Sequence, residues 1–340
     1  MILRKLSYCF TLMGLAAFQA SFGFSQDFDS TVSPDYFLGS GNENSNFTVS
    51  RAGGVEIGLR AKLRFNEADG NRPANIFNSN GDGSYNFQAR NVVGEAGLPA
   101  WWVFPESPEW SFEFSINSDT SGADARPVGD LTYELSLDQD PSLGTDFFSF
   151  DPINLPYADH FFGTSTTLDG TDETVAGSAE QYAGYLQSKT VAQQAWNYAF
   201  FLDYLPGFSA SAIGVYDIAL TAYDSGEPIA SVTIRVLVGA EQFAGQDSQT
   251  VVTNEVAQLT EHTYATNVSK GIDNSLDKKL ENALDAYIGG IYGSRFEVAE
   301  RLDSYISHVE AQRGKKLGNA DADFLRAGAE YTQVLVVILP

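Results

Sequence analysis

Apolar and polar residues alternate along much of the chain between Phe47 and Val238. A period of two places apolar side chains on one face of a β-strand and polar side chains on the other. From Val55 to Phe65 the apolar positions alternate with Glu56, Gly58, Arg60, Lys62 and Arg64. This pattern predicts a strand with one solvated face. The same alternation predicts further strands at 110–116, 131–137, 196–200, 216–222 and 229–238.

The last two of these stretches predict a hairpin, because Asp224-Ser225-Gly226-Glu227 between them is a turn sequence. The alternation changes phase near Ala230 and Ser231, which predicts a β-bulge in the second strand. Residues 178–192 interrupt the pattern and fit either a short helix or a loop packed on a sheet. Many short strands joined by turn-rich stretches favour an antiparallel β-sandwich, Ig-like or jelly-roll-like.

The hydrophobic period changes to that of a helix after Gly245. Apolar stripes at helical spacing predict a bundle of three or four helices over residues 246–340. Asn319 is predicted to be the N-cap of the last helix. The apolar residues 334–339 fit three roles: closing the bundle, adding a strand edge or inserting in a membrane. They are too few for the last, which needs about 20 residues. The stripes comprise Val251, Val256, Leu259 and Tyr264; Ile272, Leu276, Leu280, Leu284 and Ile288; Phe296, Val298, Leu302, Ile306 and Val309; and Phe324, Leu325 and Ala329.

The first 25 residues have the organisation of a signal peptide. Arg4 and Lys5 precede an apolar run, and the small residues that follow predict cleavage after Gly23 or Ser25. We therefore expect a secreted protein, extracellular or at the cell surface, with no transmembrane helix after cleavage. The predicted organisation is a signal peptide at 1–25, a β-sandwich domain at 26–245 and a small α-helical bundle at 246–340. The single cysteine, Cys9, lies in the leader, so no disulfide is expected in the mature chain.

The chain of 340 residues has a net charge of −24. Residues 26–245 hold 30 acidic and nine basic side chains, and residues 246–340 hold 14 and nine. Such a surface repels phosphate backbones, so nucleic acid is excluded as a partner. The favoured interpretation of the acidity is a solvating surface, and cation binding is the alternative.

One segment has the spacing of a calcium loop. Asn78, Asn80 and Asp82 place oxygen-bearing side chains at alternate positions before Gly83. The bidentate carboxylate expected at the twelfth position is replaced by Ala89. A Gly- and Asn-rich turn between strands explains the same residues. No cofactor is predicted other than calcium at these three residues.

Aromatic and catalytic motifs give few candidates. Trp101 and Trp102 are adjacent, so one of them could stack on a sugar ring while the other packs inside, although packing of both is favoured. Trp110 and Trp196 are predicted to lie in the core. The dipeptide Asp159-His160 has no accompanying Gly-x-Ser-x-Gly motif. No catalytic residue is predicted.

Several segments resemble a group of uncharacterised secreted bacterial β-sandwich proteins. The resemblance lies in residues 58–62, 110–117, 191–198 and 214–222. Members of that group often carry a PEP-CTERM sorting signal, whose Pro-Glu-Pro motif and basic end are absent here. Residues 271–330, and the run Val309–Leu317 above all, resemble a FIMAH-like helical module found at the C-termini of exported bacterial proteins. These resemblances imply an architecture and no particular reaction.

These observations predict a non-enzymatic secreted or cell-surface protein that acts in adhesion, matrix or surface assembly. Its partner would be a cell-surface or matrix component, either protein or polysaccharide. A carbohydrate-binding module that uses Trp101 or Trp102, assisted by calcium, is the first alternative. An extracellular hydrolase, with an acid–base pair hidden among the 44 acidic residues, is the second.

Overall fold

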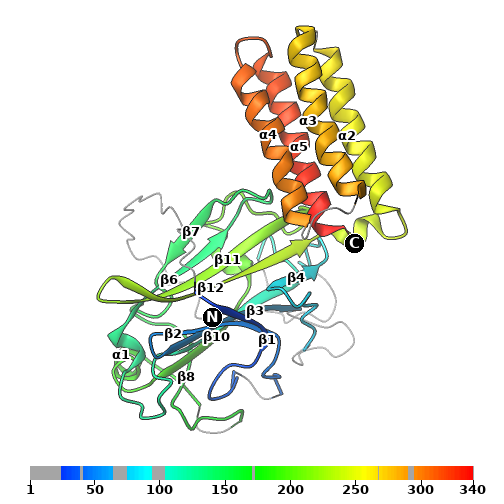
Figure 1. The fold of residues 1–340 in the computed structure, drawn as a ribbon. Coiled ribbons are helices and arrows are strands. Elements are labelled where there is room, and N and C mark those ends of the chain that lie inside the picture. The colour runs from blue at the N-terminus through cyan, green and yellow to red at the C-terminus, as the bar shows by residue number, and fades with distance from the viewer. Residues whose placement is uncertain are drawn as a thin grey trace.

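The computed structural model describes residues 24–38, 41–63, 75–93, 104–170, 173–266, 268–289 and 295–339. In these ranges the chain forms a two-layer β-sandwich followed by a bundle of helices (Figure 1). The predicted fold class is therefore confirmed. The last described strand ends at Val238 and the first helix of the bundle begins at Ser248, on either side of the predicted boundary at residue 245.

The larger sheet has seven strands in the order β1-β2-β3-β5-β10-β8-β9. All its neighbouring strands are antiparallel. In this order the strands are β1 (Gln26–Ser30), β2 (Phe47–Ala52), β3 (Val55–Leu63), β5 (Trp110–Asn117), β10 (Val191–Trp196), β8 (Phe161–Gly163) and β9 (Thr174–Val175).

The smaller sheet has five strands in the order β4-β12-β11-β6-β7. They are β4 (Ser84–Phe87), β12 (Glu227–Val238), β11 (Gly214–Asp224), β6 (Thr132–Asp138) and β7 (Phe147–Phe150). The antiparallel prediction holds except that β4 pairs in parallel with β12, so this sheet is mixed.

The predicted hairpin is β11 and β12, and its bulge is present. Both central turn residues, Ser225 and Gly226, have positive φ angles of 52° and 86°, which suits the right-handed twist of the strands. Ala222 pairs with Ala230 whereas Tyr223 pairs with Pro228, so Ile229 is the extra residue.

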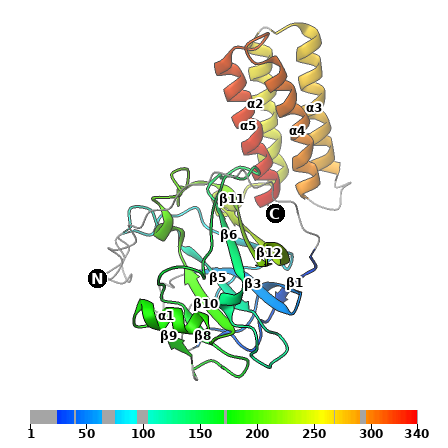
Figure 2. The same cartoon turned by 90° about the vertical axis from the view of Figure 1, so that its left-hand side faces the viewer.

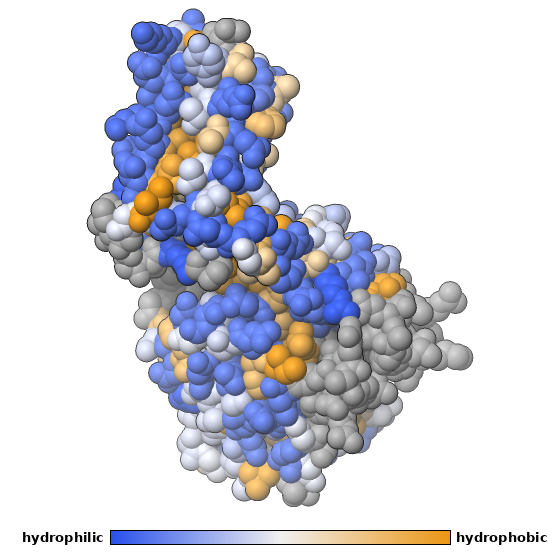
Figure 3. All heavy atoms as spheres, turned by 90° about the vertical axis from the view of Figure 1, so that its right-hand side faces the viewer, coloured by the Kyte–Doolittle hydropathy of each residue, from blue (hydrophilic) through white to orange (hydrophobic). Residues whose placement is uncertain are grey.

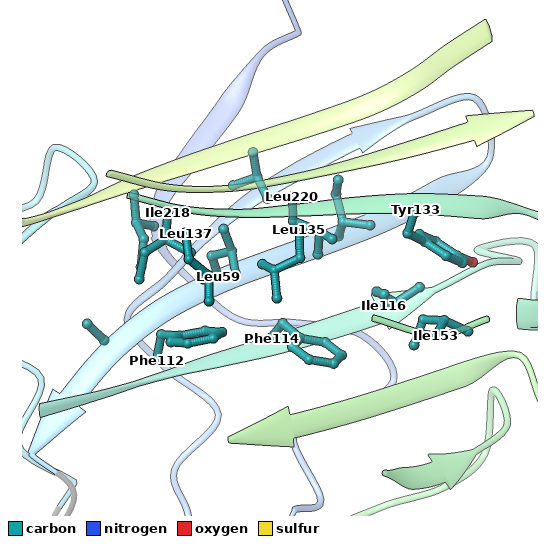
Figure 4. Close-up of a cluster of buried hydrophobic side chains, with 14 of the residues drawn as sticks. Leu59, Phe112, Phe114, Ile116, Tyr133, Leu135, Leu137, Ile153, Ile218 and Leu220 are labelled. Atoms are coloured by element: carbon teal, nitrogen blue, oxygen red, sulfur yellow. The ribbon is translucent and has the colours of Figure 1, made fainter. Parts of the chain in front are cut away.

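The main core lies between the two sheets (Figure 4). Leu59, Phe114 and Ile116 from the larger sheet face Leu135 and Leu220 from the smaller one. Alternation places these side chains on the inner faces, where burial of apolar area stabilises the fold. Trp110 is 1% exposed, and Trp196 packs against the same core, which confirms the prediction for both.

The predicted strand at 196–200 is wrong. The chain turns at the buried Asn197, whose side chain accepts a hydrogen bond from the backbone N–H of Ala199, and Tyr198–Phe201 form a 3₁₀-helix. The strand is instead Val191–Trp196. The ambiguous segment before it contains helix α1 (Ala179–Leu186), which begins at a Ser178 N-cap and buries Tyr182.

The bundle consists of α2 (Ser248–Ala265), α3 (Lys270–Gly289), α4 (Arg295–Gln312) and α5 (Asn319–Ile338). Asn319 is the first residue of α5 and not its N-cap; Gly318 holds that position and makes no side-chain cap. Tyr264, Ile288 and Phe324, predicted in the apolar stripes, are 77%, 47% and 50% exposed. The four-residue steps from Ile272 to Ile288 drift around a helix of 3.6 residues per turn, so the end of that stripe leaves the core.

The apolar C-terminal run is the end of α5, and it joins the bundle to the sandwich. Val334–Leu339 pack with Val215 and Leu237, which lie on the outer face of the smaller sheet. Arg295 donates a hydrogen bond to the carbonyl oxygen of Leu339. The bundle therefore stands end-on upon the sandwich (Figures 1 and 2). We call this contact the junction.

The outer surface of the bundle is largely hydrophilic in Figure 3, and apolar residues gather near its base, toward the sandwich. Among the described helices, none combines the length and apolar character that crossing a membrane requires.

Candidate functional site

The outer face of the larger sheet is covered, so the prediction of a solvated face on β3 is wrong. Glu56, Arg60 and Lys62 are 2%, 0% and 4% exposed. They are buried because the chain between β1 and β2 folds across this face. We call residues 31–38 of that connection the strap.

The strap is held by side chains of the sheet that bind its backbone. Glu56 Oε1 accepts a hydrogen bond from the Ser33 N–H at 2.5 Å, and Asn117 Nδ2 donates to the Ser33 carbonyl oxygen at 3.0 Å. Further along, Gln193 Oε1 accepts from the Phe37 N–H at 2.9 Å and its Nε2 donates to the Asp35 carbonyl oxygen at 2.6 Å. Buried backbone groups need such partners where no strand pairing supplies them. Three strands, β3, β5 and β10, thus bind the main chain of one segment.

Two glycines of the sheet leave space for apolar side chains of the strap. A Cβ atom at Gly58 would lie 2.7 Å from Val32 Cγ1, and a Cβ atom at Gly163 would lie 2.8 Å from Phe37 Cζ. Val32 and Phe37 are 2% and 0% exposed. Any larger residue at either glycine would displace the strap, so these positions are seats for its side chains.

A charged cluster lies on the same face. Glu113 accepts a hydrogen bond from Arg60 Nε at 2.6 Å and pairs with Lys62 Nζ at 2.5 Å. Burial alone would raise the pKa of Glu113, but the charges of Arg60 and Lys62 outweigh it and lower that pKa to about 2. Arg60 also donates to the carbonyl oxygens of Glu43 and Ser45, each at 2.6 Å.

Aromatic rings complete the surroundings of Arg60. Its guanidinium carbon lies 4.4 Å from the ring centroid of Tyr36, 4.1 Å from that of Phe47 and 4.4 Å from that of Phe77. Cation–π attraction offsets part of the cost of removing this charge from water. The face as a whole therefore binds an extended segment through that segment's backbone groups, including its carbonyl oxygens, and through that segment's apolar side chains.

A second group of polar residues lies near the junction. Asp138, at the end of β6, is 1% exposed, and its Oδ1 accepts hydrogen bonds from the N–H groups of Asp140 and Asp146 at 3.0 and 2.8 Å. Its Oδ2 accepts from the N–H of Asp217 at 3.4 Å. Burial raises the pKa of Asp138 to about 7, because desolvation outweighs these hydrogen bonds and the nearby Asp217 adds to it.

The neighbouring Asp217 is engaged by Arg235 through two hydrogen bonds of 2.6 and 2.8 Å. The guanidinium of Arg235 lies 4.4 Å from the ring centroid of Phe296, on α4 of the bundle. Asp138 and Asp217 resemble a catalytic acid–base pair in one respect only: the carboxyl group of Asp138 is shielded from water and lies beside a second carboxyl group, that of Asp217. Both carboxyl groups are engaged by protein donors and hold the 139–146 loop and the junction in place.

The predicted calcium residues form a tight turn before β4. Asn80 Oδ1 accepts from Asn86 Nδ2 at 2.6 Å, and Asp82 Oδ1 accepts from both the N–H and the hydroxyl of Ser84. Asn78 points its amide nitrogen at the Asn86 carbonyl oxygen. Across the described residues, no three His, Cys, Asp or Glu side chains converge to hold a metal ion. Calcium binding by this turn stays a prediction.

Trp101 and Trp102 lie outside the described residues, so their predicted role as sugar-binding residues is not tested. Another aromatic group, which sequence reasoning missed, lies at the β7 edge of the sandwich. The rings of Phe148 and Tyr204 stack at 4.8 Å and 12°, and those of Phe148 and Phe150 at 5.3 Å and 25°. Tyr204 is 40% exposed. The run Phe-Phe-Ser-Phe at 147–150 was the available signal.

His160 is a core residue. It is fully buried, its Nε2 donates to the Pro152 carbonyl oxygen at 2.7 Å, and it contacts the rings of Phe114, Tyr182 and Trp196. Burial lowers its pKa to about 4, so it is neutral at physiological pH. These contacts give it a packing role.

No family model matches the chain, and no curated protein is significantly similar to it. The two resemblances stated above stay predictions, and a functional assignment rests on the geometry.

Proposed function

We propose that this protein is a secreted, non-enzymatic component of the cell surface or extracellular matrix that acts in adhesion or assembly. The observation that carries the proposal is the end-on attachment of the bundle through the buried end of α5. A helix of 20 residues is about 30 Å long, and α3 and α5 both have that length. The bundle thus presents its far end well away from the sandwich, as a bridging protein requires.

The charged groups support the same class of function. Glu113 and Asp138, whose pKa values are strongly shifted, are buried and engaged by protein donors. The outer face of the larger sheet also binds an extended segment, the strap of the same chain. The excess of acidic residues suits a polysaccharide or protein partner and opposes nucleic acid.

Fractionation of producing cells, followed by chemical cross-linking, tests the proposal. We expect the protein in the washed outer fraction, cross-linked to a surface or matrix component or to itself. The variant Leu335→Asp, which places a charge in the junction, should lose that retention. Tyr264→Asp on the exposed face of α2 is the matched control. A wild-type protein that washes off freely and cross-links to nothing contradicts the proposal.

Carbohydrate binding is the second candidate, and the aromatic edge of β7 favours it. Stacked rings at a sandwich edge are suited to the apolar face of a sugar ring. A glycan array, run with and without chelator, would show retention that is lost in Tyr204→Ala and kept in Phe28→Ala, an exposed aromatic residue on β1. Retention that Tyr204→Ala leaves unchanged removes this edge as the binding site.

A further inference from the structure

The strap and β2 together form a small apolar cluster that is separate from the main core. Val32, Tyr36, Phe47 and Val49 pack together on the outer face of the larger sheet, with Leu38 beside them. None of these residues belongs to the cluster between the two sheets. Detachment of the strap therefore leaves the main core in place.

The face under the strap tolerates water. Besides Glu56, Arg60 and Lys62 it carries Glu113 and Gln193, which hydrate well when uncovered. The apolar residues that the strap covers there are Phe47 and Val49 of β2. The cost of detachment falls on the apolar side chains of the strap and on Phe47 and Val49, which the strap covers. Opening the strap alone should therefore require much less free energy than exposing the main core.

The chemistry of the face selects one occupant. The space at Gly58 accommodates Val32, and the space at Gly163 accommodates Phe37. The strap backbone between Val32 and Phe37 is held in register by hydrogen bonds with three side chains of the sheet: Glu56, Asn117 and Gln193. A second copy of the same segment meets all these requirements. The strand before the strap, β1, pairs in the described sheet with β2 alone, so it can leave together with the strap.

We propose that the strap is exchanged between molecules: the residue 31–38 segment of one copy binds the outer face of the larger sheet in a second copy. Reciprocal exchange gives a closed dimer, and head-to-tail exchange gives an open chain. This inference rests on the proposed function in assembly, and it names a second copy of the chain as a partner.

Engineered cysteines test the exchange, in chains that begin at Gln26 and so contain no natural cysteine. One chain carries Val32→Cys. A second chain of different size carries Gly58→Cys together with Val32→Ala, which removes the atom that a Cβ at residue 58 would meet first and so lets this chain keep its own strap. Because Val32 Cγ1 lies 2.7 Å from the Cβ position of residue 58, a strap bound in the second chain brings the two sulfur atoms within bonding reach. Mixing, brief warming and oxidation should yield a covalent heterodimer on a non-reducing gel. The control acceptor, Ser225→Cys in an exposed turn together with Val32→Ala, should not yield it.

A chain with both substitutions, Val32→Cys and Gly58→Cys, checks the geometry of the seat. If it closes its disulfide within one chain while the mixed chains form no heterodimer above the control, the strap stays in its own molecule and the proposal is overturned. That result leaves retention of the wild-type protein at the cell surface unaffected. Failure of retention with a heterodimer present would instead contradict the proposed function.

Discussion

The two faces of the seven-stranded sheet are both buried, but different interactions stabilise them. Along β5 every residue is buried, with Phe112, Phe114 and Ile116 on the inner face. Glu113 and Asn117 point to the outer face, where they bind Arg60 and the strap. The inner face is stabilised by apolar area, whereas the outer one combines directional contacts with the small apolar cluster of the strap and β2. Alternation along a strand therefore reports the chemistry of each face and not its exposure to water.

The largest expected effect concerns the inner face. Phe114→Ala removes a fully buried ring from the centre of the core, and the cavity that remains should reduce the free energy of unfolding by about 4 kcal/mol. Chemical denaturation measures the loss. Phe28→Ala, at a 46% exposed aromatic residue, should change it by less than about 0.5 kcal/mol. Equal losses in the two variants would show that the core is misassigned.

On the outer face, the free energy of unfolding should depend on whether buried charges are paired and not on side-chain volume. Glu113→Ala leaves Arg60 and Lys62 buried without their carboxylate, and we expect a loss of about 3 kcal/mol in unfolding free energy. Replacing all three residues together (Arg60→Met, Lys62→Met, Glu113→Leu) should recover much of this loss, because no unpaired charge remains. If the triple variant is less stable than Glu113→Ala, the attraction among the three charged side chains exceeds the cost of removing them from water.

The outer face of the smaller sheet extends the comparison, because Arg235 there hydrogen-bonds Asp217 and not the buried carboxyl of Asp138. The pKa of Asp138 is raised to about 7 in the folded protein, so its contribution to stability is present below about pH 4 and is lost as the pH rises through 7. Asp138→Asn should therefore gain about 2 kcal/mol relative to wild type at pH 8 and nothing at pH 4. Urea titrations at both pH values measure the difference, and parallel curves for the two proteins would contradict the assignment.

The smallest effect should be confined to the strap. Gln193→Ala removes the acceptor of the Phe37 N–H and the donor to the Asp35 carbonyl oxygen, at a local cost of about 1 kcal/mol. Hydrogen exchange should speed up at Phe37 while the amides of the β11–β12 hairpin keep their rates. Gln187→Ala, at an exposed glutamine, is the control. Uniformly faster exchange would show that the strap unfolds only with the whole domain.

The sequence predicted the elements with strong local patterns. The hairpin, its bulge, three of the long strands and the helical bundle follow from spacing that neighbouring residues impose. Short edge strands such as β9, with two residues, carry too few positions for a period to be seen. The 3₁₀-helix after Asn197 was missed because a single buried side chain turns the chain there.

The strap and its face were not predictable from periodicity. Glu56, Arg60 and Lys62 have the composition of a solvated strand face, and only the packing of a distant segment buries them. Gly58 and Gly163 are seats only in relation to Val32 and Phe37, which no local pattern relates to them. The residues of the calcium motif do form the turn that their Gly and Asn content predicts, and calcium binding there stays a prediction.

The parallel pairing of β4 with β12 sets an order on folding. Ser84 lies opposite Arg235, so the two strands meet only after a very long loop closes, and such closure is slow. The β11–β12 hairpin needs a two-residue turn and can form within microseconds. We therefore expect β12 to be paired on its β11 side well before β4 arrives, and the last edge of the small sheet to mature late in refolding.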